Sequence, residues 1–146
     1  MIALDTNILV FARRAEAPHH REALALLRRL ASGNEPWALT WVSIYEFLRV
    51  VTHPRVFSPP TAIEAAIEGV EALLDSPSLQ MLGEGPEHGI RMRRTLLDGM
   101  VSGNLVHDGH IAALLLEHGI TEFWTADRDF RRFRGIRAVD PFRRPG

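Results

Sequence analysis

Acidic side chains that could do chemistry together are spread along this 146-residue chain, and three stand out by position: Asp5, Asp108 and Asp127. Carboxylates that converge on one place repel one another, and they stay ionised together only when a cation joins them. Oxygen ligands in a chain without cysteine favour a hard divalent ion, Mg²⁺ or Mn²⁺. Such an ion activates water and neutralises a phosphodiester during hydrolysis. The acids therefore indicate metal-dependent phosphodiester chemistry, provided that the fold brings them together.

The predicted elements favour this convergence. Asp5 directly follows a short apolar strand, Ile2–Leu4, and Asp127 follows a strand over Thr121–Thr125 after one residue. In open parallel α/β sheets, functional groups collect at the carboxyl ends of the strands. Asp108 begins a predicted helix and lies on its apolar face, where a carboxylate is costly unless it caps, pairs or binds a cation.

Two of these positions also have a plainer interpretation. Asp5 can cap the helix predicted by the apolar run after Asn7, which stabilises a helix by about 1 kcal/mol. Thr6 and Asn7 can cap equally well, and three successive caps are more than one helix start requires. Asp127 and Asp129 can each cap a short helix or pair with an arginine, and their spacing does not distinguish between them.

Glu46 is a fourth acidic candidate, and its local pattern favours a structural role. Ser43 and Glu46 have the spacing of a capping box, in which the glutamate accepts a hydrogen bond from the serine amide. A helical wheel puts Glu46 nearly opposite an apolar stripe that includes Ile44 and Phe47. Periodicity alone therefore predicts a capping or solvent-exposed glutamate.

Composition narrows the remaining function classes. The chain has no lysine, so all 17 basic residues are arginines. This excludes a Walker A loop, a pyridoxal phosphate site, aspartyl-phosphate enzymes and receiver domains, all of which need a lysine. The absence of cysteine excludes disulfides and thiolate sites. The longest apolar run, Ile111–Leu116, is too short to span a bilayer, and no signal peptide is evident, so we expect a cytoplasmic protein.

The order of the predicted elements indicates an α/β fold in a single domain over residues 1–146, a normal size for one domain. Short apolar strands alternate with helices, which is typical of a short parallel sheet between helical layers. Strands are predicted over 2–4, 37–40, 78–82, 121–125 and 137–139. Helices are predicted to begin at Ile8, Pro18, Ser43, Ala62, Glu87 and Asp108, with a short helix or turn over 127–133.

Two histidines offer a rival metal site. His107 and His110 are three residues apart and flank Asp108. A zinc site needs a third protein ligand, and none stands at a suitable spacing in the sequence. We therefore predict that His110 is a polar residue on the helix face that pairs with an acid.

Four segments in series resemble the motifs of the PIN-domain nucleases, in the form common among the VapC toxins of bacterial toxin–antitoxin pairs. They stand in the family's order and span nearly the whole chain. The segments are Ile-Ala-Leu-Asp5-Thr-Asn7, Val42-Ser-Ile-Tyr-Glu46-Phe-Leu-Arg, Gly103-Asn-Leu-Val-His-Asp108-Gly-His and Trp124-Thr125-Ala-Asp127.

The resemblance implies a three-layer α/β/α sandwich and Mg²⁺- or Mn²⁺-dependent endoribonuclease activity. It also implies a homodimer and a VapB-like antitoxin that inserts a segment at or near the active site. By position, Asp5 and Asp108 correspond to the principal metal ligands, and Glu46 and Asp127 to the remaining acids. The resemblance thus favours Asp127 over Asp129 and a functional role for Glu46. Asn7 and Thr125 belong to the same motifs and are expected to orient the carboxylates.

The arginines suggest how the substrate would be held. The net charge is only −1, yet seven arginines stand between Arg128 and Gly146 against two aspartates. A basic edge of this kind suits phosphate contacts, although a solvated tail explains it equally well. We expect the backbone of RNA, in particular tRNA or rRNA, to contact Arg91, Arg94, Arg128, Arg131 and Arg132.

One departure from the family pattern is Gly109, where VapC-like sequences usually carry alanine. A glycine in the first turn should loosen the helix by about 0.5–1 kcal/mol relative to alanine. No acid of the four motifs is missing, which favours an active enzyme. The alternative is an RNA- or partner-binding module that keeps this fold without turnover.

Overall fold

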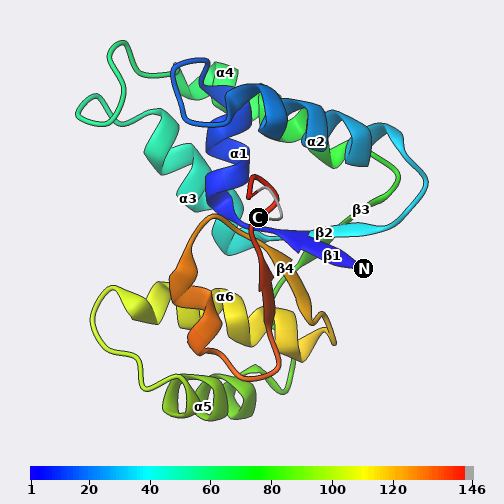
Figure 1. Ribbon diagram of the computed structural model, residues 1–146, viewed down its shortest axis with the longest axis vertical. Coiled ribbons are helices and arrows are strands. Elements are labelled where there is room, and N and C mark those ends of the chain that lie inside the picture. The colour runs from blue at the N-terminus through cyan, green and yellow to red at the C-terminus, as the bar shows by residue number, and fades with distance from the viewer. Residues whose placement is uncertain (144–146) are drawn as a thin grey trace.

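The computed structural model describes residues 1–143 and shows a five-stranded parallel sheet between two helical layers (Figure 1). The strand order is β3-β2-β1-β4-β5, and every neighbouring pair is parallel. The predicted three-layer α/β/α fold is therefore confirmed. Arg144, one of the arginines counted in the basic C-terminal segment, lies outside the described residues.

All five predicted strands are present, with small changes at their ends. The strands are β1 (Ile2–Leu4), β2 (Trp37–Thr40), β3 (Leu79–Leu82), β4 (Glu122–Trp124) and β5 (Arg137–Val139). The helices are α1 (Thr6–Arg13), α2 (His20–Ser32), α3 (Trp41–Val51), α4 (Ile63–Leu74), α5 (His88–Asp98) and α6 (Leu105–Glu117), with a short 3₁₀ helix, η1 (Arg128–Arg132). None of the helices in residues 1–143 is long and apolar enough to cross a lipid bilayer.

Successive side chains of each strand enter two separate cores. Leu4 and Trp37 pack with α1, α2, α3 and α4 on one face of the sheet. Ala3, Ala38 and Phe123 face the other side, where they pack against α6. In Figure 1 these layers lie above and below the sheet. The strict alternation fixes the strand register, because a slip of one residue would exchange the two faces.

The helix that carries Asp108 is enclosed on two sides. Residues 111–115 of α6 are all buried, because the sheet covers one side of the helix and α5 packs on the other. The small side chains Ala3, Ala38 and Ala112 meet between the helix and the sheet. This close packing fixes the position of the first turns of α6.

Gly109 has a packing role in addition to the effect expected from its helix propensity. It is buried, and a Cβ atom on this residue would lie 2.3 Å from Leu96 Cδ2 of α5. The absence of a side chain therefore lets α5 pack closely against α6. A side chain at this position would have to displace the end of the Leu96 side chain, whereas the expected loosening of the helix by glycine stays a prediction.

Some helices begin earlier or later than predicted. α6 begins at Leu105, so Asp108 lies inside its first turns rather than at its start. α2 begins at His20 rather than at Pro18, after His19 adopts a left-handed backbone conformation with φ 55°. α3 begins at Trp41 rather than at Ser43, because Thr40 supplies the cap: its Oγ1 accepts a hydrogen bond from Ser43 N at 3.1 Å.

Candidate active site

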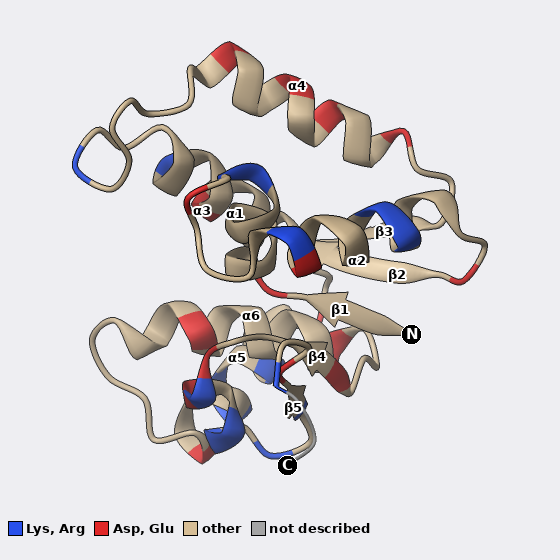
Figure 2. Ribbon diagram, turned by 45° about the horizontal axis from the view of Figure 1, so that its top comes forward, with Lys and Arg blue, Asp and Glu red and all other residues tan. Residues whose placement is uncertain are grey.

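Four carboxylates from distant parts of the sequence line one open cleft of about 270 Å³: Asp5, Glu46, Asp108 and Asp127. Asp5 follows β1 and Asp127 follows β4, and these two strands are neighbours in the sheet, so the loops after them emerge side by side. α3 and α6 bring Glu46 and Asp108. Figure 2 shows acidic positions in red at the end of β1 and near the start of α6, on the same side of the molecule.

Asp5 is the most enclosed of the four acids, with 5% of its surface exposed. Its Oδ1 accepts a hydrogen bond from Thr6 N at 2.7 Å, so the predicted cap on α1 is confirmed. Its Oδ2 accepts from Thr125 Oγ1 at 2.6 Å and from Asn7 Nδ2 at 3.4 Å. Burial nevertheless raises the pKa of Asp5 to about 7, because desolvation of the carboxylate outweighs these hydrogen bonds and nearby acids add repulsion.

Asn7 and Thr125 connect the loop after β1 to the loop after β4. Thr125 Oγ1 donates to Asp5 and accepts from Asp127 N at 2.9 Å. Asn7 Nδ2 lies 3.4 Å from Thr125 Oγ1, and its Oδ1 accepts from Ala126 N at 3.5 Å. The network ties both loops to the same carboxylate.

Glu46 is held by a distant residue rather than by its own helix. The predicted capping box with Ser43 is wrong, because Thr40 already caps α3. Glu46 Oε2 instead accepts a hydrogen bond from Thr6 Oγ1 at 3.0 Å. Sequence reasoning regarded Thr6 only as a possible helix cap, since the contact spans 40 residues of chain.

The other side of the cleft holds a second group of acids. Asp108, Asp127 and Asp129 each offer a carboxylate oxygen within 4.8 Å of the others. Burial raises the pKa of Asp108 to about 6, with further repulsion from Asp127, Asp129 and Glu46. Asp127 Oδ1 caps η1 by accepting from Asp129 N at 2.9 Å. Asp127 lines the cleft, whereas Asp129 is exposed beside it.

The donor set of the cleft fits a hard divalent cation. Its ionisable groups are all carboxylates, and two of them have pKa values raised by burial and mutual repulsion. A bound cation would place a positive charge beside both carboxylates. It would lower their pKa values and keep them ionised near neutral pH. Oxygen ligation selects Mg²⁺ or Mn²⁺ over softer ions.

A second and larger cleft of about 620 Å³ adjoins the first, and Glu46 lines both. On its α3 side stand Trp41, Tyr45 and Arg49, which repeat every fourth residue and so share one helix face. Trp41 is 42% and Tyr45 71% exposed, an unusual position for large aromatic side chains. Sequence reasoning missed this row, although the spacing beside Glu46 was visible in the sequence.

The arginines expected to contact RNA occupy different surroundings. Arg128 and Arg131 line a shallow hollow next to Asp127. Arg132 Nη1 donates to the carbonyl oxygen of Gly99 at 3.3 Å. The remaining two, Arg91 and Arg94, lie on α5 and line neither cleft. Figure 2 shows further arginine positions, in blue, on α2 on the opposite side of the sheet from α5.

Comparison with known proteins agrees with this geometry. Residues 2–136 match the PIN domain, so the chain belongs to the PIN-domain family. It is 39% identical over 138 residues to Ribonuclease VapC48 of Mycobacterium tuberculosis, a match that covers 94% of this chain and 95% of the relative. It is 40% identical over 141 residues to VapC ribonuclease Mb2897 of Mycobacterium bovis, with 97% and 95% covered. Within the family, the chain is thus of the VapC type.

Solved structures show the same fold at lower identity. Mycobacterium tuberculosis VapC20, described as a sarcin-ricin loop cleaving toxin, matches with a TM-score of 0.66 and 18% identity, covering 94% of this chain and 99% of that one. VapBC2 from Rickettsia felis, bound to a DNA fragment from its promoter, matches with a TM-score of 0.64 and 20% identity, covering 95% and 98%.

The raised pKa of Asp5 predicts how stability depends on pH. Since the folded-state pKa of about 7 lies above the ordinary value of 3.8, the folded state binds more protons. This contribution to stability is complete below pH 3.8 and is lost as the pH rises through about 7. In EDTA at pH 8 we therefore expect Asp5→Asn to melt at a higher temperature than the wild type. Added Mg²⁺ should stabilise the wild type more than the variant.

Thermal unfolding between pH 4 and pH 8 measures both effects. Asp98→Asn, which changes an exposed carboxylate on α5, is the matched control and should follow the wild type. Identical pH profiles for the wild type and Asp5→Asn would contradict the raised pKa of Asp5.

Proposed function

We propose that this chain is a Mg²⁺-dependent endoribonuclease that acts as the toxin of a toxin–antitoxin pair. The observation that carries the proposal is the cleft in which Asp5, Glu46, Asp108 and Asp127 meet. The similarity to proteins named VapC ribonucleases supports RNA as the substrate and hydrolysis as the reaction.

The carboxylates have separate tasks in this proposal. Asp5 and Asp108 bind the cation, and Glu46 and Asp127 complete its surroundings directly or through water. Bound Mg²⁺, or Mn²⁺ in its place, supplies activation of water and neutralisation of the phosphodiester charge. The pKa values of about 7 and about 6 mean that Asp5 and Asp108 give up their protons readily at neutral pH once a positive charge is near.

The uncharged residues around the acids hold them in place. Thr125 and Asn7 both donate to Oδ2 of Asp5, which limits the directions in which this carboxylate can turn. Thr6 donates to Oε2 of Glu46 and leaves Oε1 available to the cleft. This positioning lowers the cost of ordering the ligands when the cation and the RNA bind.

The two adjoining clefts offer a path for a single strand of RNA. On one side of Glu46, the exposed rings of Trp41 and Tyr45 can stack on bases, and Arg49 can pair with a phosphate. On the other side, Arg128 and Arg131 stand beside Asp127, where they can hold the backbone. We propose a single-stranded or loop segment of tRNA or rRNA as the substrate, because stacking needs bases that are free of a duplex.

The proposed partners rest on the family. A VapB-like antitoxin is supported by the similarity in fold to VapB–VapC complexes, such as the one from Rickettsia felis. We also propose a homodimer, a cytoplasmic location and a single domain over residues 1–146.

The alternative function is an RNA- or partner-binding module without turnover. It predicts the same clefts, so only a cleavage assay distinguishes it from the nuclease.

The nuclease proposal predicts cleavage of a panel of tRNA and rRNA by the purified protein with Mg²⁺ or Mn²⁺. Asp5→Asn and Asp108→Asn should each lower the rate by about 10²–10³-fold, the usual cost of removing a group that stabilises the transition state. Asp98→Asn, outside the cleft, should keep the wild-type rate. RNA that is bound but left intact would support an RNA-binding module instead. RNA that is neither bound nor cut would contradict the nuclease and leave only the partner-binding module.

If Trp41 and Tyr45 stack on bases, loss of one ring should weaken RNA binding and leave the cleavage chemistry intact. We expect Tyr45→Ala to weaken RNA binding by about 5- to 150-fold, which corresponds to the 1–3 kcal/mol of one base stacked on an aromatic ring. Tyr45→Phe keeps the ring and should bind almost as the wild type does. Fluorescence anisotropy with an uncleavable RNA analogue measures this. Equal affinities for Tyr45→Ala and the wild type would contradict base stacking on this face of α3.

A further inference from the structure

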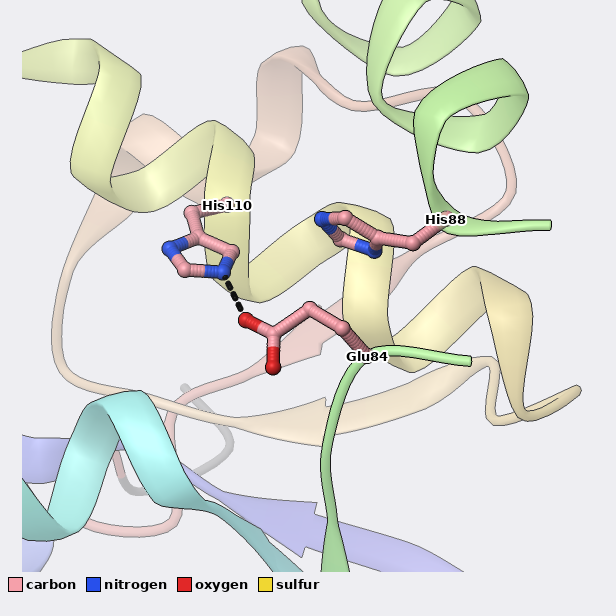
Figure 3. A group of neighbouring side chains, drawn as sticks. All are labelled: Glu84, His88 and His110. Carbon is pink, nitrogen blue, oxygen red and sulfur yellow. Dashed lines mark hydrogen bonds and ion pairs between the residues drawn. The ribbon is translucent and has the colours of Figure 1, made fainter. Parts of the chain in front are cut away.

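We propose that Glu84, His88 and His110 form a binding site for a zinc-class transition-metal ion, separate from the carboxylate cleft (Figure 3). One ligand atom of each residue lies within 4.8 Å of the others. Two imidazoles and one carboxylate are a donor set with which zinc forms three-ligand sites that keep a fourth position open. Glu84 and His110 line the larger cleft, so the open position has access to it.

The closest pair of ligands needs only a small adjustment to admit the ion. His110 Nε2 and Glu84 Oε1 are joined by a hydrogen bond of 2.6 Å. Two ligands of a tetrahedral zinc ion stand about 3.3 Å apart, as follows from metal–ligand bonds of about 2.0–2.2 Å. The pair must therefore open by less than about 1 Å. Glu84 can make this movement, because half of its side chain, 49%, is exposed.

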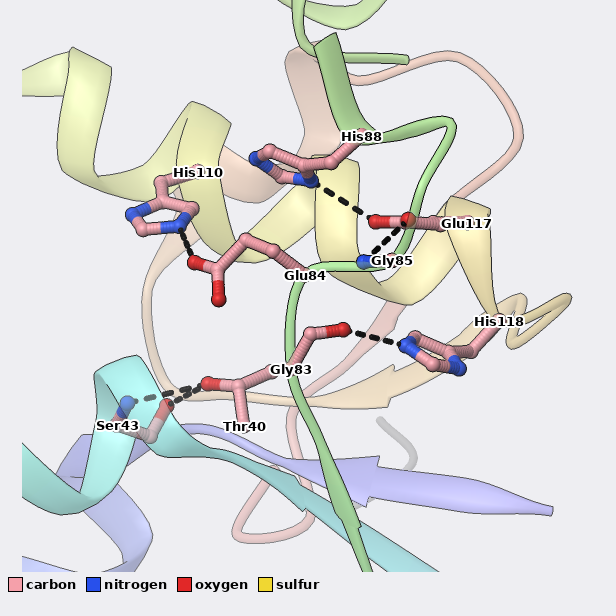
Figure 4. A network of polar contacts seen from close by, with 9 residues as sticks. All are labelled: Thr40, Ser43, Gly83, Glu84, Gly85, His88, His110, Glu117 and His118. Carbon is pink, nitrogen blue, oxygen red and sulfur yellow. Dashed lines mark hydrogen bonds and ion pairs between the residues drawn. The ribbon is translucent and has the colours of Figure 1, made fainter.

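His88 is already oriented as a metal ligand. Its Nδ1 is hydrogen-bonded to Glu117 Oε2 at 2.8 Å, which leaves Nε2 free (Figure 4). Figure 3 shows the free nitrogen pointing toward His110. A carboxylate behind a ligating histidine fixes its tautomer and raises its basicity, an arrangement that recurs at zinc sites. Glu117 has only 9% of its side chain exposed, so this carboxylate is built into the protein.

The loop that carries Glu84 is held from two sides by the end of α6. Glu117 Oε1 accepts a hydrogen bond from Gly85 N at 2.8 Å, and His118 Nε2 lies 2.8 Å from the carbonyl oxygen of Gly83 (Figure 4). A Cβ atom at Gly85 would lie 2.7 Å from Glu117 Oε1, so a larger residue there would displace the end of the Glu117 side chain. The same carboxylate therefore positions both the loop of Glu84 and the ring of His88.

The chemistry separates this site from the carboxylate cleft. Imidazole nitrogens favour zinc and its neighbours in the first transition row, whereas Mg²⁺ prefers oxygen ligands. The expectation that His110 pairs with an acid is confirmed by Glu84. The group is not the pair of His107 and His110 considered from the sequence: His107 stays outside it, and Glu84 and His88 join His110. The site does not depend on the proposed nuclease activity.

Zinc binding by the full chain in excess Mg²⁺, which occupies the carboxylate cleft, tests the proposal. Equilibrium dialysis with metal analysis should find one tightly held zinc per chain for the wild type. His110→Gln and Glu84→Gln should lose it. Glu117→Gln, which removes the charge behind His88, should weaken binding by about 10- to 100-fold. Replacement of zinc by Co²⁺ should produce the visible absorption of a four- or five-coordinate site with nitrogen ligands in the wild type.

Two controls make the test specific. His107→Gln alters a histidine of the same cleft outside the proposed ligand set, and Asp5→Asn alters the carboxylate cleft; both should bind zinc as the wild type does. Circular dichroism checks the fold of each variant, and Glu84→Gln changes a half-exposed side chain whose charge alone is removed. Absence of tightly held zinc in the wild type, or equal binding by His110→Gln and Glu84→Gln, would overturn the site. Loss of zinc in Asp5→Asn would assign the ion to the carboxylate cleft instead.

Discussion

The burial of one carboxylate, that of Asp5, is the constraint on which the rest of the candidate site depends. Desolvation raises the pKa of this group to about 7, even though three donors surround it. A protein built for stability alone would place a neutral side chain at the end of its central strand. Glu46 and Asp108 add to the repulsion. A bound cation would make this arrangement favourable at neutral pH, so we expect the folded chain to bind a metal ion at this place.

The surrounding structure keeps these acids close despite their repulsion. Parallel pairing of β1 and β4 puts Asp5 beside the loop of Thr125 and Asp127. Packing of α6 between the sheet and α5 fixes the backbone position of Asp108, and Gly109 leaves room for the side chain of Leu96 in this packing. The energy that holds the acids together therefore comes from apolar burial in both cores rather than from the site itself.

Local sequence patterns predicted much of the fold and site, and failed where a contact spans a long stretch of chain. Short apolar runs located the strands, and the end of a strand located Asp5. The spacing of Ser43 and Glu46 suggested a capping box, yet Thr40 caps α3 and the true partner of Glu46 is Thr6. These long-range contacts are set by packing, which periodicity does not reveal. The pairing of His110 with Glu84 and the packing of Gly109 against Leu96 were hidden for the same reason.

We propose that the carboxylates of the first cleft hold a divalent cation. Crystals of the protein soaked in MnCl₂ test it directly, because Mn²⁺ replaces Mg²⁺ and is located by its anomalous scattering. We expect an anomalous peak between Asp5 and Asp108, with Glu46 and Asp127 around it, and no such peak in crystals of Asp5→Asn. Crystals of the wild type without a peak in this cleft, although the protein cleaves RNA in the same MnCl₂ solution, would contradict it.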